Sequence, residues 1–201
     1  MNILSLFPIA VGQFKLEREL TKQEYKYIGE ADRRPNMGNT TSVANYVLRD
    51  KPLKKLGDFF LECANKYFTE IYRPRHDVKI YITQSWLNFT EKGQFHHKHA
   101  HPNSFISGVF YVNANPTTDK IFFFNDTYRQ ISVPASEFNL YNSESWWLEA
   151  GAGTLYLFPS SLTHMVEAVG HEEPRISLSF NTFLKGTIGD NQSLTELLTE
   201  E

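Results

Sequence analysis

Histidine is the residue type whose placement in this sequence most clearly suggests chemistry. Four of the seven histidines lie in the segment FHHKHAH, at His96, His97, His99 and His101. Residues two apart in an extended backbone project to the same face, so His99 and His101 can bring two imidazoles together as metal ligands, and His97 shares their parity as far as the backbone stays extended. The spacing indicates a metal site, although a merely solvated histidine-rich loop fits the cluster equally well when the cluster is taken alone.

A further histidine, His164, lies much later in the chain. It comes after GAGTLYLFPSSLT, where a β-prone run ends at Pro159 and a Ser-Ser turn leads into a strand that starts near His164. An imidazole near the start of a strand is well placed to face the mouth of a barrel. Taken alone, such a histidine is more often an ordinary hydrogen-bonded residue, so its interpretation depends on the next strand of the chain.

That next strand, RISLSFNTF, has two different sides. Its apolar residues Ile176, Leu178 and Phe180 share one face. The polar face consists of Arg175, Ser177, Ser179 and Asn181. A guanidinium binds a carboxylate through two hydrogen bonds and a hydroxyl can add a third, so Arg175 and Ser177 would suit a carboxylate ligand. The alternative is a polar face turned towards solvent.

Two helices are expected ahead of these segments. Residues 21–34 are charged and weakly amphipathic, which predicts a surface helix. Residues 51–72 predict a longer helix with Asp50 as its N-cap and Pro52 in its first turn. Apolar residues repeat in it at three- and four-residue spacing, at Leu53, Leu56, Phe60, Ala64, Tyr67, Phe68 and Ile71. Cys63 lies beside this stripe and is expected to be a small buried side chain rather than a nucleophile.

From about residue 78 onward the sequence predicts strands. Runs rich in β-branched and aromatic residues are separated by Gly, Pro, Asn and Asp, namely KIYITQSWLNFT, NSFISGVFYVNAN, KIFFFND, GTLYLFP, HMVEAV and RISLSFNTF. The lack of helices between them favours an antiparallel sandwich or barrel, with the helices packed on one outer face. We expect one domain over 1–201, with a helical part at about 15–75, a β core at about 78–183 and a polar tail, 185–201, that is partly mobile or a short capping helix.

Composition and charge limit the classes of function. The chain is 41% apolar and 21% charged, which argues against bulk disorder. A net charge of -3 without a long basic tract gives no support for sequence-independent nucleic-acid binding. Cys63 is the only cysteine, which excludes an intrachain disulfide and suits a reducing compartment. Neither a secretory leader nor a membrane span is indicated, so we expect a cytoplasmic protein.

The motifs in their order along the chain resemble the 2-oxoglutarate and Fe(II)-dependent oxygenase superfamily. HxH is followed by GxLYLFPSxLxH and then by RISLSFN, and HAHPNSFISGVFYV at 99–112 is similar to the segment HxHPNSxxSGVxYV of a group of small bacterial and phage members. The similarity spans about residues 84–183. It implies a mainly β fold with N-terminal helices, a cupin-like double-stranded β-helix, or jelly-roll.

The resemblance also implies a site and a reaction. The family holds Fe(II) through an HxD/E pair and a distal histidine, while 2-oxoglutarate chelates the metal and places its far carboxylate on an Arg or Lys of a late strand. Carried over, this makes His99, His101 and His164 the iron ligands, and Arg175 and Ser177 the cosubstrate anchors. The implied activity is that of a 2-oxoglutarate-dependent dioxygenase, a hydroxylase that uses O2 and releases succinate and CO2.

One departure from the family pattern concerns the carboxylate ligand. The family's facial triad has two histidines and a carboxylate, but here His101 stands two residues after His99. The nearest acids, Glu91, Asp119 and Asp126, lie outside the motif. Two alternatives therefore stay open: a ligand set that includes His97, and a cupin-type three-histidine metalloenzyme that does not use 2-oxoglutarate. The Arg175 and Ser177 pair favours the cosubstrate interpretation.

Several other residues are candidates for contacts with the cosubstrate or substrate. Four lie on strands that flank the histidines, at Trp86, Asn88, Ser107 and Tyr111. Asn88 and Tyr111 are expected among the cosubstrate-binding residues, although strand aromatics more often belong to the core. Trp146 and Trp147 form either a substrate lip or a loop packed on the sandwich. His76 and His171 carry no specific signal.

The same features bear on partners and rival functions. The substrate is expected to be a small molecule or a peptide, and the exposed sheet edges of a jelly-roll are compatible with a homodimer. Besides the three-histidine metalloenzyme, a non-catalytic jelly-roll binding protein is the second rival, and it would tolerate the loss of His164 or Arg175.

Overall fold

The fold consists of two antiparallel β-sheets and two helices. A computed structural model describes residues 1–75, 77–127, 131 and 133–199. The helices are α1 (Lys22–Gly29) and α2 (Lys54–Tyr72), with 3-10 turns at Val47–Arg49 and Lys51–Leu53. The strands are β1 (Gly12–Lys15), β2 (Arg33–Pro35), β3 (Thr40–Ser42), β4 (Lys79–Thr90), β5 (His96–His99), β6 (Ile106–Asn113), β7 (Lys120–Phe124), β8 (Ser145–Glu149), β9 (Thr154–Pro159), β10 (His164–Val166), β11 (Arg175–Ile188) and β12 (Leu197–Thr199).

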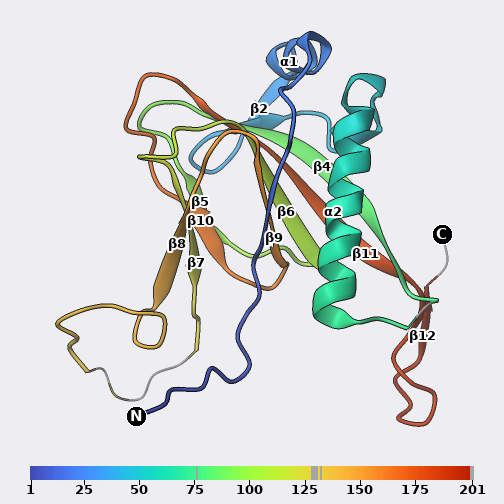
Figure 1. Ribbon diagram of the computed structural model, residues 1–201. Coiled ribbons are helices and arrows are strands. Elements are labelled where there is room, and N and C mark those ends of the chain that lie inside the picture. Colours follow the sequence, from blue (N-terminus) through green and yellow to red (C-terminus); the bar gives the residue numbers. More distant parts are fainter. Residues whose placement is uncertain (76, 128–130, 132, 200–201) are drawn as a thin grey trace.

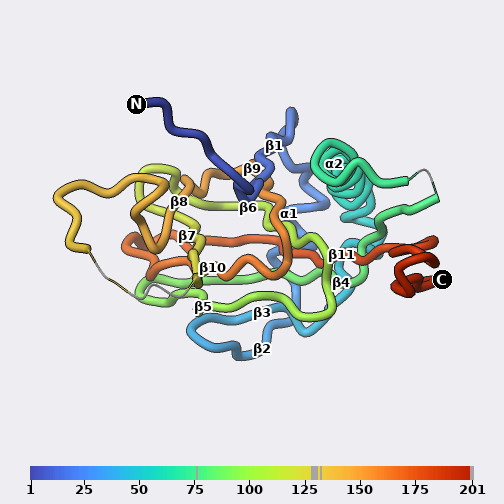
Figure 2. Tube along the Cα trace, turned by 90° about the horizontal axis from the view of Figure 1, so that it is seen from below, coloured from blue at the N-terminus to red at the C-terminus, as the bar shows by residue number. Residues whose placement is uncertain are grey.

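The order of the strands is that of a double-stranded β-helix. The larger sheet runs β1-β9-β6-β11-β4-β3-β2, with β12 paired to β11, and the smaller sheet runs β5-β10-β7-β8. From β4 to β11 the chain passes repeatedly between the two sheets, so that β4, β6, β9 and β11 lie in one and β5, β7, β8 and β10 in the other. Figures 1 and 2 show the larger sheet between α2 on one side and the smaller sheet on the other. The predicted jelly-roll is confirmed.

Helix α2 covers the outer face of the larger sheet. The ring of Phe60 stacks on Phe180 of β11 with 5.2 Å between centroids, and it contacts Phe110 of β6 at the same separation. All three side chains are fully buried. The apolar face of β11 therefore packs against α2. Cys63 is buried in this cluster, as predicted, and burial raises the pKa of its thiol to about 11.

A second core lies between the two sheets. It is formed by Val109, Tyr111, Ile121, Phe123, Ala150, Tyr156, Phe158, Leu162 and Val166. Residues on the inner faces of both sheets meet here, as the alternation of side chains along each strand requires. The inner face of β11, which carries Arg175 and Ser177, borders the same space.

Both predicted helices need corrected boundaries. Helix α1 begins after Thr21, whose hydroxyl accepts from the backbone N–H of Glu24 in a capping box, and it ends at Gly29 because the chain then enters β2. The α-helical part of 51–72 begins at Lys54, after a 3-10 turn. Asp50 does not cap it; its carboxylate accepts a hydrogen bond from the hydroxyl of Tyr27. Ile71 is 49% exposed, so the predicted stripe ends before it.

Several strands differ from the sequence prediction. The histidine segment itself forms β5, and the two tryptophans lie on β8 rather than in a loop. In the tail, Leu197–Thr199 forms β12 and pairs with the end of β11, so these residues do not form a capping helix. Strand β11 runs on to Ile188, past the predicted RISLSFNTF. In the part of the chain that is described, no helix has both the length and the apolar character to cross a membrane.

Candidate metal and cosubstrate site

Three histidines from two neighbouring strands and an adjoining turn meet between the sheets. His99 ends β5 and pairs directly with His164, the first residue of β10. The ligand atoms of His99, His101 and His164 all lie within 4.8 Å of one another. The Nε2 atoms of His99 and His101 are 3.0 Å apart, and the ring centroid of His164 lies 4.4 Å from that of His99. The structure thus brings together the three histidines that the sequence singled out, which we call the inner set.

The second nitrogen of each ring already has a partner. His99 Nδ1 lies 2.7 Å from the carbonyl of His97, and His164 Nδ1 lies 3.0 Å from the carbonyl of Leu162. His101 Nδ1 lies 2.6 Å from Asn181 Oδ1. Because these oxygens are acceptors, the proton of each neutral imidazole belongs on Nδ1 and the lone pair on Nε2. Such contacts are the usual way in which proteins orient metal-binding histidines.

The inner set is arranged to stay uncharged. Burial lowers the pKa of His164 to about 3 and that of His99 to about 4, and the neighbouring imidazoles contribute to lowering both. Burial also lowers the pKa of His101. A neutral imidazole can donate its lone pair to a metal ion, so no proton has to be displaced at neutral pH.

No carboxylate joins these three rings among the described residues. Glu91 faces Arg33 at 3.6 Å and Asp126 accepts from Lys98 at 2.8 Å, both near the surface. Asp119 is buried, and its carboxylate pairs with the guanidinium of Arg175. The chemistry of the donor set is therefore three imidazole nitrogens, a set that suits Fe(II) as well as Zn(II) and other first-row metals.

Arg175 lies at the inner end of the polar face of β11. Its side chain is 4% exposed, so the solvent-facing alternative is wrong. Nη1 donates to Asp119 Oδ1 at 3.0 Å and Nη2 donates to the carbonyl of Glu167 at 3.0 Å. The other oxygen of Asp119 lies 3.1 Å from His171 Nε2. Two of the five guanidinium N–H groups are used in these bonds, which leaves donors for a further anion.

Tyr111 and Asn88 extend this polar region across the larger sheet. Ser177 is the pairing partner of Tyr111 on β6 and of Asn88 on β4, so the three residues form a row over three adjacent strands. Asn88 donates from Nδ2 to Ser179 at 3.0 Å and to Ser177 at 3.4 Å. Its Oδ1 and the hydroxyl of Tyr111 are buried without a hydrogen-bond partner among the described residues. Such orphaned groups are costly unless a ligand or water meets them.

A small cavity of about 30 Å³ joins the histidines to this row. It is lined by Trp86, His96, His99, His101, Gly108, Val109, Ile121, Phe158, His164, Met165, Val166, Ser177 and Ser179. Trp86 stands 5.7 Å from the ring of His101, between centroids. Ser107 does not line the cavity. Its hydroxyl lies 2.8 Å from His101 Nδ1 and helps to orient that ring.

The remaining candidates fall in different places. Trp146 and Trp147 are 41% and 42% exposed on β8, and Lys120 lies 3.8 Å above the ring of Trp147. They are therefore partly exposed residues of a strand and do not lie in a buried loop. His76 lies outside the described residues.

Three contributors were missed from the sequence. Asp119 accepts a hydrogen bond from Arg175, His171 contacts the other oxygen of Asp119, and Asn181 holds His101. Asn181 could have been found, because it shares the parity of Arg175 and Ser177 on β11. The pairing of Asp119 with a residue 56 positions away had no local signal.

Comparisons with known proteins agree with this geometry. Residues 84–181 match the family model described as "Putative 2OG-Fe(II) oxygenase". No curated protein sequence matches. Among solved structures, a prolyl-4-hydroxylase from Pseudomonas putida is 14% identical, with 86% of this chain and 92% of that chain covered and a TM-score of 0.56.

Two further structures share the fold. A prolyl hydroxylase from Trichoplax adhaerens, in complex with a hypoxia inducible factor oxygen degradation domain peptide fragment, is 12% identical over 86% of this chain and 83% of that chain, with a TM-score of 0.59. The non-heme alpha ketoglutarate dependent epimerase SnoN from nogalamycin biosynthesis is 12% identical over 89% and 80%, with a TM-score of 0.58. At such identities the likeness shows the fold alone. Together, the family match over residues 84–181 and the shared fold support the assignment of the chain to the 2-oxoglutarate and Fe(II)-dependent oxygenase superfamily.

Proposed function

We propose that the protein is a 2-oxoglutarate-dependent dioxygenase that holds Fe(II) on His99, His101 and His164 and hydroxylates a C–H bond of a small molecule or a peptide. The observation that carries the proposal is the inner set itself. Three imidazoles from separate parts of the chain turn their ligand atoms to within 4.8 Å of one another, and the opposite nitrogen of each is held by an acceptor.

The chemistry of the described residues suits both the metal and the cosubstrate. Three neutral nitrogen ligands leave coordination positions open, as catalytic metal sites require. When bound, iron and 2-oxoglutarate would supply the oxidative chemistry, with O2 as oxidant and succinate and CO2 as products. The role of the protein is to position these groups and to keep water away from them.

Arg175 is the proposed anchor for the far carboxylate of 2-oxoglutarate. Its charge is buried, and its free N–H groups can donate to a second carboxylate beside Asp119. The unpartnered hydroxyl of Tyr111 and the hydroxyl of Ser177 are the neighbouring hydrogen-bonding groups. Asn88 holds Ser177 and Ser179 through its amide nitrogen, which leaves its Oδ1 to accept from a bound ligand or water.

The reaction at the substrate carbon is the finer part of the proposal. Hydroxylation is chosen because two of the structures with this fold are named prolyl hydroxylases. The epimerase among the solved structures shares the same fold, so the outcome depends on how the substrate is held. Product analysis by mass spectrometry separates the two, since hydroxylation adds one oxygen atom and epimerisation adds none.

A three-histidine metalloenzyme that does not use 2-oxoglutarate is the second candidate. The observation that favours it is the carboxylate of Asp119, whose Oδ1 already accepts a hydrogen bond from Arg175 Nη1 at 3.0 Å. In that case the guanidinium serves the fold and not a cosubstrate. The orphaned hydroxyl of Tyr111 favours the first candidate, because a buried donor of this kind needs a ligand.

Anaerobic titration with 2-oxoglutarate tests the choice. Protein loaded with Fe(II) should develop a visible metal-to-ligand charge-transfer band as 2-oxoglutarate is added. The matched control is Asp58→Asn, which changes an exposed carboxylate paired with Lys54 on α2 and should leave the band unchanged. If the loaded protein shows no band although it binds the metal, 2-oxoglutarate is not its cosubstrate and the second candidate stands.

A further inference from the structure

Strand β5 contains an irregularity directly beside the inner set. On β10, His164 and Val166 are two residues apart, but their partners on β5, His99 and His96, are three apart. One extra residue is therefore accommodated in β5, as in a β-bulge. A bulge changes the direction of the side chains next to it, so the simple alternation expected from the sequence does not hold for His96 and His97.

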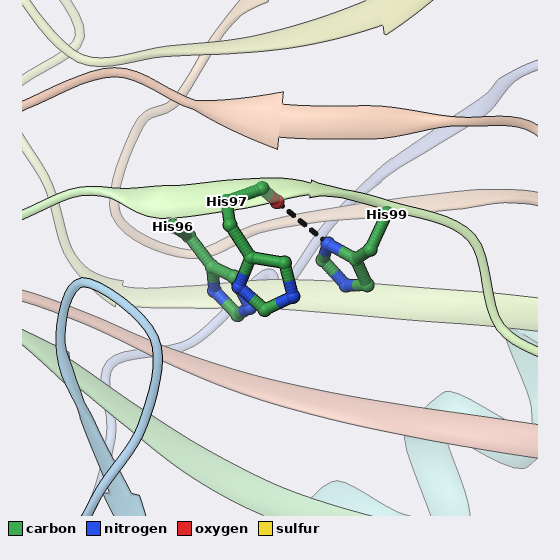
Figure 3. Close-up of side chains that lie close together, drawn as sticks. All are labelled: His96, His97 and His99. Atoms are coloured by element: carbon green, nitrogen blue, oxygen red, sulfur yellow. Dashed lines mark hydrogen bonds between the residues drawn. The ribbon is translucent and has the colours of Figure 1, made fainter.

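The bulge places three histidines on one side of β5. Figure 3 shows His96, His97 and His99 with their rings extending in the same direction from the strand. The ring centroids of His96 and His97 lie 4.8 Å and 4.7 Å from that of His99, and the planes of His96 and His99 differ by only 9°. The ligand atoms of all three lie within 4.8 Å of one another. We call these residues the outer set.

The separation of these atoms is close to what a metal ion needs. Bonds from nitrogen to a first-row metal are about 2.0–2.1 Å long, which puts two ligand atoms roughly 3–3.5 Å apart. Side-chain rotations that move the ligand atoms by about an ångström would bring the outer set to this spacing. All three of its rings are partly exposed, whereas His164 of the inner set is buried. His97, which belongs only to the outer set, is therefore nearer to solvent than His164, which belongs only to the inner set, while His96 lines the same cavity as the inner set.

His99 belongs to both sets, and it can serve only one ion at a time. Its Nδ1 donates to the carbonyl of His97 at 2.7 Å, so a single lone pair, on Nε2, is left for coordination. Occupation of the outer set therefore excludes full occupation of the inner set. The arrangement suits transfer of one ion and not the storage of two.

We propose that the outer set is a capture position for a divalent metal ion, which passes to the inner set by exchange around His99. His97 and His96 bind the ion first, and His101 and His164 replace them as it moves inward. The inference goes beyond the proposed oxygenase activity and rests on it only for the role of the inner set as the final metal position.

Binding of Co(II) to the full-length protein tests this without any turnover. Absorbance in the visible region reports the ion, and competition with a chelator gives its affinity. We expect wild type to bind one Co(II). His164→Ala breaks only the inner set, so it should still bind Co(II), with a changed spectrum. Adding His97→Ala to it should weaken binding by at least about tenfold, as expected for loss of a metal-binding contact.

The single variant His97→Ala measures the transfer itself. It leaves the inner set complete, so the equilibrium affinity should equal that of wild type while the rate of Co(II) uptake in stopped-flow mixing falls severalfold. Asp58→Asn is the control, since it changes an exposed side chain on α2 that belongs to neither set. If His164→Ala does not fold, as judged by circular dichroism, His101→Ala replaces it because it also breaks only the inner set.

Three results would overturn the proposal. They are equal Co(II) affinity with and without His97 in the His164→Ala background, two tightly bound ions in wild type, and unchanged uptake in His97→Ala. None of these readouts uses 2-oxoglutarate. Absence of the charge-transfer band would therefore refute the proposed function and leave the metal result standing.

Discussion

The two sheets of this protein differ in what they contribute. Strands β4 and β11 of the larger sheet are long, are paired over eleven positions, and support α2 through Phe60 and Phe180. The smaller sheet has strands of three to five residues, yet it supplies His99 and His164. The larger sheet carries the packing against α2 and Arg175, the proposed anchor, while the smaller sheet carries two of the three proposed metal ligands. Variants in each sheet should therefore affect different measurements.

The largest effect is expected from His164→Ala. Loss of one of three inner ligands should lower Fe(II)-dependent succinate formation by more than about 100-fold, because even contacts behind a metal ligand are worth 10- to 100-fold. The unfolding midpoint of the metal-free protein should change little, since the smaller sheet adds less to the core. A metal-free variant that unfolds much more readily than wild type would contradict the division between the sheets.

Phe60→Ala should lower the stability of the protein and leave its affinity for metal unchanged. Removing this fully buried ring from between Phe110 and Phe180 should lower the free energy of unfolding by about 3–5 kcal/mol. Urea unfolding measures this loss. At low temperature, where the variant stays folded, its Co(II) affinity should match that of wild type. A matching loss of metal affinity would show that the two sheets are not separable.

Arg175→Gln should separate binding of the cosubstrate from binding of the metal. Hydrogen bonds to a charged group are worth about 1.5–3 kcal/mol, so the affinity for 2-oxoglutarate should fall roughly 10- to 150-fold. The affinity for Fe(II) should stay the same, because the variant leaves the inner set untouched. Titration of the charge-transfer band gives both values. Equal affinity for 2-oxoglutarate in the variant and wild type would remove Arg175 from the site.

The pH dependence of stability should also distinguish the sheets. In the metal-free protein, the pKa of His164 is lowered to about 3, below its ordinary value of 6.5. The unfolded chain therefore binds a proton that the folded chain does not, and stability falls as pH drops from 6.5 towards 3, by at most about 1.4 kcal/mol per pH unit for this group. Urea unfolding at several pH values should show a shallower fall for His164→Ala than for wild type.

Ile71→Ala should have the smallest effect. This residue is about half exposed at the end of α2, so its truncation should change the free energy of unfolding by no more than about 0.5 kcal/mol. It is the matched control for Phe60→Ala on the same helix. A loss comparable to that of Phe60→Ala would mean that the packing of α2 against the larger sheet extends further along the helix than the burial of its residues indicates.

The sequence predicted the long strands better than the short ones. The bounds of β4 were found correctly, and the parity of β11 placed Arg175 and Ser177 on one polar face, because long strands show clear alternation. Strand β8 was missed, since its five residues are half exposed and do not show a buried face. Short strands depend on their neighbours, and that information is not local.

The candidate site was likewise predictable only in part. His99 and His101 were paired by their spacing, and they do lie together. His97 was placed by parity, but the β5 irregularity changes its direction and brings in His96 as well. Asp119 gave no signal, because ion pairing between distant segments depends on the three-dimensional arrangement. Local spacing and the family resemblance thus identified the proposed metal ligands, and neither identified all of the groups that hold them.

One strand links both ends of the site. Arg175 and Asn181, the partner of His101, are six residues apart on β11, with β4 and β6 hydrogen-bonded on either side. At about 3.3 Å per residue, their α-carbons are held about 20 Å apart. This length of backbone sets the spacing along the strand between the residue that holds His101 and the residue that carries the guanidinium. Insertion of two residues between them would keep every side chain on its face and lengthen the span by about 6.6 Å.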